Sequence, residues 1–375
     1  MRKLRMGMAG GGPGAFIGPV HRIAAELDGA IALTAGAFSS DAVRSAEAGV
    51  GYRLDPLRAY PSVEAMIAAE RGREDPIDFL VIATPNHLHL PTAKAALESG
   101  LPVLSDKPMT ATLAEAKRLA EVVSSAGRPY ALTYTYTGYP LVREARARVA
   151  AGELGAVRKV VVEYAQGWLA QPIERSGAKQ AEWRVDPARA GAGGCIGDIG
   201  VHAFNLAEFV TGERVSAISP DLAAVVPGRR LDDDVSVLLR FGNGARGVLI
   251  ASQISIGELN GLRLRVYGDI GSLDWRQEAP NTLTLHRLDG TTEVVRAGDA
   301  SLGPAARAAT RLPGGHPEGY LEAFANLYRD FAAWLTDGGR PDTIQGAEEG
   351  VRGMAFIEAA VDGSRVGGGW MKFEA

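Results

Sequence analysis

Short apolar runs alternate with helical patterns through the first third of the chain. Leu4–Ala9, Ile31–Phe38 and Phe79–Ala83 are mostly apolar runs that indicate buried strands, and shorter runs follow at Pro102–Ser105 and Tyr130–Tyr134. The segments between them have the apolar spacing of helices: Val20–Leu27, Val63–Glu70, Leu90–Ser99 and Thr112–Ala126. Strands that alternate with helices over short connections predict a parallel sheet covered by helices on both faces.

A different pattern begins near residue 140. Strand-like segments now follow one another more directly: Val157–Tyr164, Val235–Phe241, Arg246–Ser252, Leu262–Val266 and Thr282–Leu288. Two of them flank Gly242-Asn243-Gly244, and an Asn-Gly turn between strands is typical of a β-hairpin. A long amphipathic helix is expected over Tyr320–Leu335. This part therefore predicts a large, mostly antiparallel open sheet accompanied by helices.

Together the two patterns predict an α/β protein with two domains, and 375 residues are enough for two cores. The first domain is expected to span residues 1–137 and to hold the parallel sheet. The second is expected to span residues 138–375, with the last residues either staying there or returning to the first domain.

Composition narrows the class of protein. A 46% apolar and 22% charged composition is ordinary for a globular protein, and a net charge of −4 gives no electrostatic reason to expect a nucleic-acid partner. No apolar run approaches the length of a membrane span, and Gly10–Gly14 interrupts the apolar start before a signal core could form. One cysteine, Cys195, excludes an internal disulfide and a multi-cysteine metal cage. We therefore expect a cytoplasmic protein without metal, membrane or nucleic-acid partners.

A glycine-rich segment follows the first strand and precedes the first helix. Gly10-Gly11-Gly12-Pro13-Gly14-Ala15 fits the pattern G-x-G-x-x-A, in which glycines allow a tight turn and the close approach of a pyrophosphate to the helix N-terminus. The pattern predicts a Rossmann-type dinucleotide site. Because the loop continues through Phe16-Ile17-Gly18, its register stays open, and the expected contacts are Gly10, Gly12, Gly14, Ala15, Phe16 and Ile17.

The end of the second strand bears on the choice between NAD and NADP. An acidic residue is usual there when NAD ribose is bound, but this chain has Ser39 and Ser40, followed by Asp41 and Arg44. The serines suit an unphosphorylated ribose, or, together with Arg44, a 2′-phosphate. The alternative is that Ser or Asp caps the next helix. These residues leave the choice between NAD and NADP open. For the protein as a whole NAD(H) is favoured, with NADP(H) as the alternative.

Polar residues also follow the next two strands, where open α/β sheets bind ligands. Thr84-Pro85-Asn86-His87-Leu88-His89 offers Thr84, Asn86 and His89 to a cofactor, with His87 as the alternative to His89 at the nicotinamide ribose. Asn86 is equally suited to cap the following helix. A zinc site is not expected, because no acid or cysteine lies nearby at ligand spacing. Asp106-Lys107 ends the following strand, and a lysine on this rim can stabilise an alkoxide by its charge.

Asp198 and His202 stand four residues apart behind the glycine-rich run Gly193–Gly197. If a helix begins near Asp198, both side chains lie on one helical face, and the helix dipole there disfavours a protonated imidazole. A neutral imidazole is what a general base for an alcohol requires. The glycines would let the backbone pass close to a ligand. Taken alone, the pair also fits an ordinary surface contact.

With these motifs in place, the chain resembles the glucose-fructose oxidoreductase / inositol dehydrogenase / MocA family of two-domain dehydrogenases. Their order and spacing carry the resemblance, from the glycine loop through Thr84–His89, Asp106–Pro108, Gly152–Val157, Trp183–Pro187, Gly193–His202, Asp233-Asp234 and Tyr267–Ser272. The resemblance implies a Rossmann domain, a second α/β domain whose open sheet forms subunit contacts, and a homodimer or homotetramer. It also implies a catalytic trio of Lys107, Asp198 and His202, with Asp106 in place of the family's usual glutamate. The longer glycine loop and the serines after the second strand depart from the common pattern.

Three segments resemble the branch that acts on cyclic polyols and sugars, such as scyllo-inositol, L-glucose and levoglucosan dehydrogenases: Gly12–Gly18, Tyr164–Trp168 and Gly315–Tyr320. The indole of Trp168 offers a flat apolar wall to a sugar ring, and hydroxyl-binding roles are expected for Tyr136, Gln166, Arg184 and His316. Core packing is an equal alternative for Trp168 and Tyr136.

The expected reaction is reversible hydride transfer between nicotinamide and a ring carbon that bears a secondary hydroxyl. His202 would take the hydroxyl proton, Lys107 would stabilise developing negative charge, and Asp198 would orient the substrate or His202. Two alternatives stay open: an enzyme of the same fold that uses NAD transiently to assist glycosidic elimination, and a non-enzymatic dinucleotide-sensing regulator. No role is assigned to Cys195.

Overall fold

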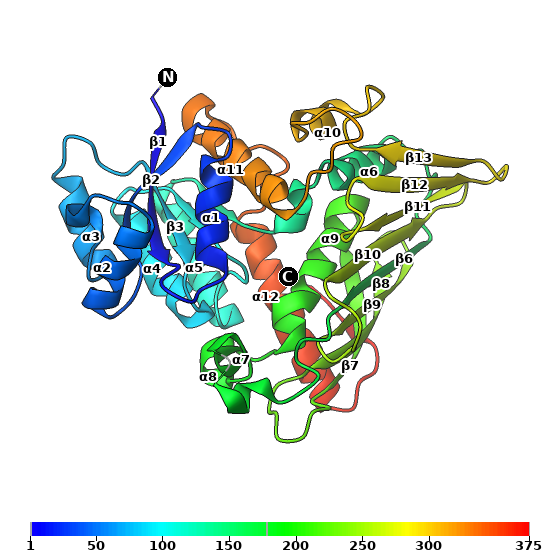
Figure 1. The fold of residues 1–375 in the computed structure, drawn as a ribbon. Coiled ribbons are helices and arrows are strands. Elements are labelled where there is room, and N and C mark those ends of the chain that lie inside the picture. Colours follow the sequence, from blue (N-terminus) through cyan, green and yellow to red (C-terminus); the bar gives the residue numbers. More distant parts are fainter. Residues whose placement is uncertain (1, 178, 375) are drawn as a thin grey trace. The chain divides into compact units, whose positions relative to one another are not determined.

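The computed structural model describes residues 2–177 and 179–374. The chain forms two compact units (Figure 1). The first combines residues 1–134 with residues 324–351, and the second combines residues 135–323 with residues 352–375. The chain therefore returns to the first unit before it finishes in the second.

The first unit contains a five-stranded parallel sheet, in the order β2-β1-β3-β4-β5. The strands are β1 (Leu4–Gly10), β2 (Ile31–Ala37), β3 (Phe79–Ala83), β4 (Val103–Ser105) and β5 (Tyr130–Leu132). Every residue of β3 is buried, because helices cover the sheet on both sides. The predicted doubly wound α/β domain is confirmed.

Helices lie on both faces of this sheet (Figure 1). They are α1 (Ile17–Glu26), α2 (Ala42–Gly51), α3 (Val63–Arg71), α4 (His89–Glu98), α5 (Leu113–Ala126) and, from Phe324 onward, α11 (Tyr320–Asp337). α1 and α11 pack together through His21, whose Nδ1 lies 2.7 Å from the hydroxyl of Tyr328. Local sequence sets the ends of α5, where Thr112 and Glu115 form a capping box and Gly127 adopts a left-handed conformation.

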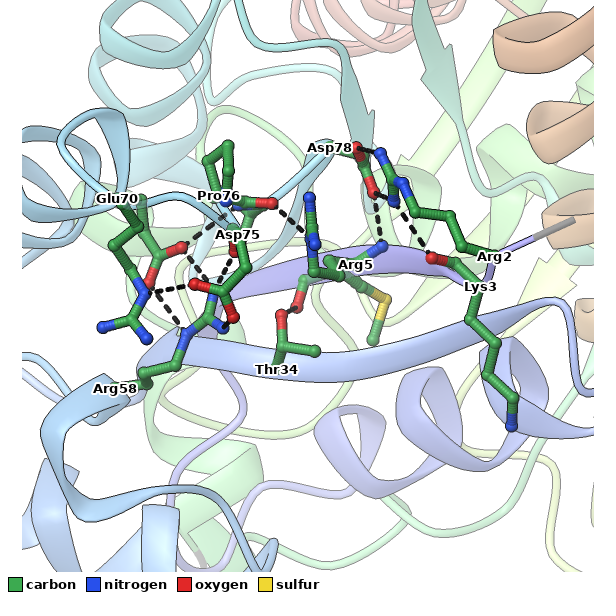
Figure 2. Close-up of polar contacts among 12 residues, drawn as sticks. Arg2, Lys3, Arg5, Thr34, Arg58, Glu70, Asp75, Pro76 and Asp78 are labelled. Atoms are coloured by element: carbon green, nitrogen blue, oxygen red, sulfur yellow. Dashed lines mark hydrogen bonds and ion pairs between the residues drawn. The ribbon is translucent and has the colours of Figure 1, made fainter.

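A polar network fixes the segment that returns the chain from α3 to β3 (Figure 2). The buried guanidinium of Arg58 donates to both carboxylate oxygens of Glu70, at 3.0 and 2.5 Å, and to Asp75 at 2.9 Å. On β1, the Arg5 side chain donates to the Pro76 carbonyl at 2.6 Å, and the Arg5 amide donates to Asp78 at 2.6 Å. These contacts anchor the segment before β3 to its neighbouring strand.

The second unit contains a nine-stranded sheet, in the order β13-β12-β11-β10-β6-β9-β8-β7-β14. Its strands are β6 (Lys159–Ala165), β7 (Val215–Ala223), β8 (Asp234–Phe241), β9 (Arg246–Ser252), β10 (Gly261–Tyr267), β11 (Gly271–Arg276), β12 (Thr282–Arg287), β13 (Thr292–Arg296) and β14 (Met371–Lys372). In this sheet β6 and β9 pair in parallel, and the other neighbouring strands pair antiparallel. The predicted large, mostly antiparallel sheet is confirmed.

Helices α6 (Pro140–Ala150) and α9 (Val201–Thr211) lie along one face of this sheet (Figure 1). Buried and half-buried residues alternate along β6, and its buried residues Val160, Val162 and Tyr164 share one face of the strand. The remaining helices of the second unit are α7 (Lys179–Arg184), α8 (Pro187–Ala190), α10 (Pro304–Ala308) and, from Arg352 onward, α12 (Ala347–Arg365). Over the described part of the chain, no helix is both long enough and apolar enough to cross a membrane.

Candidate cofactor and substrate sites

The glycine loop follows β1 at the point where the strand order reverses. Successive strands lie on opposite sides of β1, and such a switch point is where open α/β sheets bind their ligands. Gly10 has a φ of +85°, and a Cβ there would lie 2.5 Å from the carbonyl oxygen of Ala83. A Cβ on Gly12 would lie 2.5 Å from the carbonyl oxygen of Phe38. Both positions need glycine because the loop packs directly against the ends of β3 and β2.

The loop leads into an uncapped helix N-terminus. The amide of Ala15 donates to the Gly12 carbonyl at 3.0 Å, which closes a tight turn immediately before α1. No side chain caps α1 at Phe16, and its first turn from Ile17 carries no acid. The amides and the positive end of the helix dipole are therefore available to an anion such as a pyrophosphate.

Thr84, which follows β3, supplies the clearest test of whether a dinucleotide fits here. Its Oγ1 is buried and makes no hydrogen bond in the structure. A buried hydroxyl without a partner is costly, and a ligand's polar atom would satisfy it. Asn86 is also buried, and α4 begins at His89 with Leu88 at its N-cap, so both predicted roles of Asn86, toward a cofactor and toward this helix, stay predictions. The residues of this edge fit a dinucleotide.

The residues after β2 divide between two of the predicted roles. Asp41 is the N-cap of α2, and its carboxylate accepts from the Arg44 amide at 3.0 Å, as the capping interpretation expects. Ser39 accepts from the Asp41 amide at 3.2 Å, whereas Ser40 and Arg44 are exposed. A role of Ser39 and Ser40 toward ribose stays a prediction.

His89 lies between two backbone carbonyl groups. Its Nδ1 is 2.8 Å from the Pro108 oxygen, and its Nε2 is 2.9 Å from the Thr84 oxygen. Burial lowers the pKa of this imidazole, against the opposing effect of these carbonyl groups. With both ring nitrogens engaged, His89 ties the end of β3 to the end of β4. This arrangement favours a positioning role over the direct cofactor contact that we predicted.

Lys107 stands at the end of β4, in a turn that Asp106 holds. One oxygen of the Asp106 carboxylate accepts from the Lys107 amide and from the Thr133 hydroxyl, each at 2.9 Å. Lys107 is half-buried, and its peptide bond to Pro108 is cis. The Asp106 carboxylate therefore sets the backbone of the lysine, which explains how aspartate can serve where glutamate is usual.

In the second unit, Asp198 and His202 lie on one continuous helical segment. A π-helical turn over Ile196–Gly200 runs directly into α9, in which every residue is buried. The helix thus begins before Asp198, and His202 lies beyond its first turn. This weakens the expected effect of the helix dipole on the imidazole, since that effect falls off within one turn.

The carboxylate of Asp198 is held by two donors. One oxygen accepts from Arg184 Nε at 3.1 Å and from Gln253 Nε2 at 2.9 Å. Arg184 also places its guanidinium carbon 4.3 Å from the ring centre of Trp183 and 5.8 Å from that of Trp168. Asp198 and the indole of Trp168 are therefore joined through one arginine.

Packing within the chain requires one glycine of the run before Asp198, whereas the expected approach of the run to a ligand stays a prediction. A Cβ on Gly194 would lie 2.3 Å from the carbonyl oxygen of Asp232, so its close approach is to this chain's own backbone. The Asp232 carboxylate accepts from the amides of Gly194 and Ile196, each at 2.7 Å, and burial raises its pKa to about 6. Cys195 is buried in the same turn, and burial together with neighbouring carboxylates raises its pKa well above the ordinary value. A thiol in this state is a poor nucleophile.

Tyr136 packs against the catalytic candidate His202. Their ring centres are 4.9 Å apart with nearly perpendicular planes, at 78°. The Tyr136 hydroxyl is hydrogen-bonded to that of Tyr164 and receives a bond from Asn260 Nδ2 at 3.3 Å. Asn260 Oδ1 accepts from Tyr164 at 2.7 Å and from Gln166 at 2.9 Å. Trp168 completes this set, because its indole N–H donates to Gln166 at 2.9 Å.

These contacts form a closed circuit of side chains within the second unit. The contacts lead from Asp198 through Arg184, Trp168, Gln166, Asn260 and Tyr136 to His202. The backbone closes the circuit, because His202 is four residues from Asp198 on the same helical segment. The structure thus brings together all the predicted substrate-site residues of this unit except His316. That residue lies on an exposed loop, where its Nδ1 is 3.2 Å from the Pro313 oxygen.

Sequence patterns missed three members of this site: Tyr164, Gln253 and Asn260. Tyr164 belongs to a motif that supported the family resemblance, so that motif was a usable signal. Gln253 directly follows β9, and Asn260 lies in the loop before β10. No local pattern marks either of them.

Comparison with known proteins supports one family over most of the chain. Residues 4–134 match the model of an oxidoreductase family with an NAD-binding Rossmann fold, and residues 142–274 match the GFO/IDH/MocA C-terminal domain. Uncharacterized oxidoreductase YfiI of Bacillus subtilis is 33% identical over 100% of this chain and 98% of its own length. Levoglucosan dehydrogenase of Pseudarthrobacter phenanthrenivorans is 28% identical over 76% of both chains.

Solved structures agree with this result. An inositol dehydrogenase homolog from Azotobacter vinelandii, complexed with NAD+, has a TM-score of 0.95 and 35% identity, covering 99% of this chain and 98% of that one. The same homolog complexed with NADH and myo-inositol has a TM-score of 0.92 at the same identity and coverage. The chain belongs to the GFO/IDH/MocA family of oxidoreductases, with an NAD-binding Rossmann domain.

Proposed function

We propose that the protein is a dehydrogenase of a cyclic polyol or sugar, which transfers a hydride between nicotinamide and a ring carbon bearing a secondary hydroxyl. The observation that carries this proposal is the closed circuit of the second unit. It combines an indole face, amide groups and a guanidinium with the acid and the imidazole. A polyhydroxylated ring needs this combination of one apolar wall and several hydrogen-bonding groups.

The cofactor would be held by the glycine loop, the N-terminus of α1, and Thr84 with Asn86. We favour NAD(H) over NADP(H) because Asp41, two residues after Ser39, places a carboxylate beside the expected ribose site. A negative charge there disfavours a 2′-phosphate. Relatives support the choice, since the Azotobacter vinelandii homolog was solved with NAD+ and with NADH.

Different side chains of this protein would transfer the proton and stabilise the developing charge. A bound nicotinamide supplies the hydride acceptor or donor. His202 would take the proton of the substrate hydroxyl as a general base, and the Lys107 ammonium would stabilise the negative charge that develops on that oxygen. Asp198, held by Arg184 and Gln253, would orient a neighbouring hydroxyl or the imidazole.

The substrate class follows from the same side chains. Trp168 is partly exposed, so its indole can meet the C–H face of a ring, and Gln166 keeps one amide hydrogen and one lone pair beyond its two contacts. Inositols and anhydro-sugars or pyranoses fit these groups. Two relatives point to the same class by name, as a levoglucosan dehydrogenase and an inositol dehydrogenase homolog.

A spectrophotometric screen of inositols, levoglucosan and pyranoses, with NAD+ and NADP+ in parallel, tests the proposal. We expect absorbance of the reduced nicotinamide to rise with at least one cyclic polyol or sugar, and more strongly with NAD+. Conversion of a glycoside without net NADH would identify the transient-NAD alternative. Tight cofactor binding without oxidation of any polyol would favour the regulator.

We also propose a homo-oligomer, a dimer or tetramer, and a cytoplasmic location. The face of the nine-stranded sheet opposite its buried residues carries Leu238 of β8 and Ile250 of β9, exposed by 47% and 38%. Exposed apolar side chains on two interior strands of a large sheet favour a covering partner, and a second copy is the partner that family membership suggests. Light scattering after size-exclusion chromatography tests this proposal, and a monomer at micromolar concentration would contradict it.

A further inference from the structure

The indole of Trp168 sets the direction of a hydrogen-bond chain, because an indole N–H can only donate. It donates to Gln166 Oε1 at 2.9 Å, so the Gln166 amide nitrogen faces Asn260 Oδ1, also at 2.9 Å. Asn260 must then present its oxygen to Gln166 and its nitrogen to the Tyr136 hydroxyl, at 3.3 Å. One donor-only group therefore fixes the orientation of two amides.

The same reasoning assigns the two phenolic protons. Tyr164 donates to Asn260 Oδ1 at 2.7 Å, because a carbonyl oxygen can only accept. Its single proton is then used, so in the contact between the two hydroxyls Tyr136 donates to Tyr164. Asn260, Tyr136 and Tyr164 form a closed ring in which each side chain donates once to the next. The hydrogen bonds in such a ring strengthen one another. Neither phenol keeps a proton for another acceptor.

Burial keeps this ring intact. Tyr136 and Tyr164 are 4% and 3% exposed, and burial raises the pKa of both phenols, so they stay protonated at neutral pH. The backbone of Asn260 is anchored as well, because its amide donates to Glu278 at 2.8 Å. Tyr139 stacks on the Tyr136 ring, with centres 6.2 Å apart and planes inclined by 6°.

The ring faces His202. Tyr136 meets the imidazole edge to face at 4.9 Å, and the centre of the Tyr164 ring is 6.3 Å from it. Two aromatic neighbours of the proposed base, Tyr136 and Tyr164, are thus held by the side chain of Asn260.

We infer that Asn260 is a positioning residue for the dehydrogenation: by closing the ring with Tyr136 and Tyr164, it holds both phenols against His202. This inference rests on the proposed function, because it assumes that His202 acts on the substrate hydroxyl. Loss of the ring would free the Tyr136 side chain and with it the imidazole. Small displacements of a general base slow the chemical step far more than they weaken binding.

A double-mutant cycle tests the inference on the intact enzyme. Asn260→Ala removes the amide, and Tyr164→Phe keeps the aromatic ring but removes its hydroxyl. We expect each to lower kcat for the polyol found in the screen by roughly tenfold or more, as the loss of one or two buried hydrogen bonds implies, while NADH affinity changes by less than about twofold. The double variant should be no slower than the slower single variant, since both changes break one ring.

Asn243→Ala is the matched control, because Asn243 is an exposed asparagine in the β8–β9 hairpin of the same unit. It should keep the native kcat. Additive losses in the cycle, an unchanged kcat in Asn260→Ala, or an equal loss in Asn243→Ala would overturn the inference.

The same cycle, measured as unfolding midpoints without any ligand, tests the ring independently of activity. We expect the midpoint shifts of Asn260→Ala and Tyr164→Phe to be non-additive, and additive shifts would show that the two side chains are uncoupled. If the native protein oxidises no polyol, the proposed function fails while this ligand-free result still decides whether the ring exists.

Discussion

Replacing Asp232 by asparagine tests how the helix that carries Asp198 and His202 is anchored. The Asp232 carboxylate accepts from the amides of Gly194 and Ile196, each at 2.7 Å, and it is 38 and 36 residues away from them in sequence. Burial raises its pKa from an ordinary 3.8 to about 6, against the lowering effect of these amides. The ionised carboxylate is therefore less stable in the folded protein than in water, even with its two hydrogen bonds.

The sign of the pH dependence follows from this shift. Between pH 3.8 and about 6 the folded protein holds a proton at Asp232 that the unfolded chain has released. The contribution of this group to stability is therefore complete below pH 3.8, falls as pH rises through about 6, and is constant above that. The separation of the two pKa values corresponds to about 3 kcal/mol of unfolding free energy.

Urea unfolding at a series of pH values measures this difference. Four of the five tryptophans, Trp168, Trp183, Trp275 and Trp370, belong to the second unit, so a Trp334→Phe background reports on that unit by fluorescence. Asparagine does not titrate, so the stability of Asp232→Asn relative to the parent should rise by up to about 3 kcal/mol between pH 4 and pH 7. A difference that is flat, or that falls with pH, would refute the reasoning.

Three further substitutions test other parts of the structure. Thr84→Val removes the unpaired buried hydroxyl, so stability should stay within about 1 kcal/mol while NADH affinity falls roughly tenfold in a fluorescence titration; unchanged affinity would show that Thr84 does not meet the cofactor. Arg58→Met leaves the buried Glu70 carboxylate with its hydrogen bonds from Tyr60 and Ile77 but without its counter-ion, and should lower the unfolding free energy by about 3–5 kcal/mol, seen as a lower melting temperature; a loss below about 1 kcal/mol would contradict a role for the ion pair. Lys107→Ala should reduce turnover by roughly a hundredfold or more and leave NADH affinity nearly unchanged; equal loss of both would count against the charge-stabilising role.

Elements with one dominant local signal could be predicted closely. Phe79–Ala83 and Arg246–Ser252 agree with β3 and β9 residue for residue, because each is an apolar or alternating run bounded by turn residues. The helix α12 was not predicted. Gly350, Gly353 and Gly363 lower its intrinsic helix propensity, and tertiary packing overrides that preference. A Cβ on Gly350 would lie 2.6 Å from Leu132, so close packing requires glycine there.

The strand β7 was also not predicted, because Pro220 and Asp221 disfavour a strand. The structure tolerates the proline because β14 pairs with β7 only at Ala217 and Ile218. The missing N–H of Pro220 therefore falls outside the pairing with β14.

The residues of the candidate site also differ in how well the sequence predicts them. Polar residues that directly follow apolar strands, such as Thr84 and Lys107, could be located because strand ends of a parallel sheet lie on one edge. Asn260 could not, since its bonds to Tyr164 and Tyr136 join positions 96 and 124 residues apart. The close packing at Gly194 could not be predicted for a related reason: its neighbour, Asp232, is distant in sequence.

Transfer of deuterium from substrate to cofactor tests the central claim most directly. The polyol found in the screen, deuterated at the carbon that is oxidised, is incubated with NAD+ and the enzyme, and both products are analysed by mass spectrometry. Direct hydride transfer predicts one deuterium in the reduced nicotinamide for each molecule of ketone formed. Loss of the deuterium to water, or ketone formation without labelled NADH, would contradict the proposed reaction.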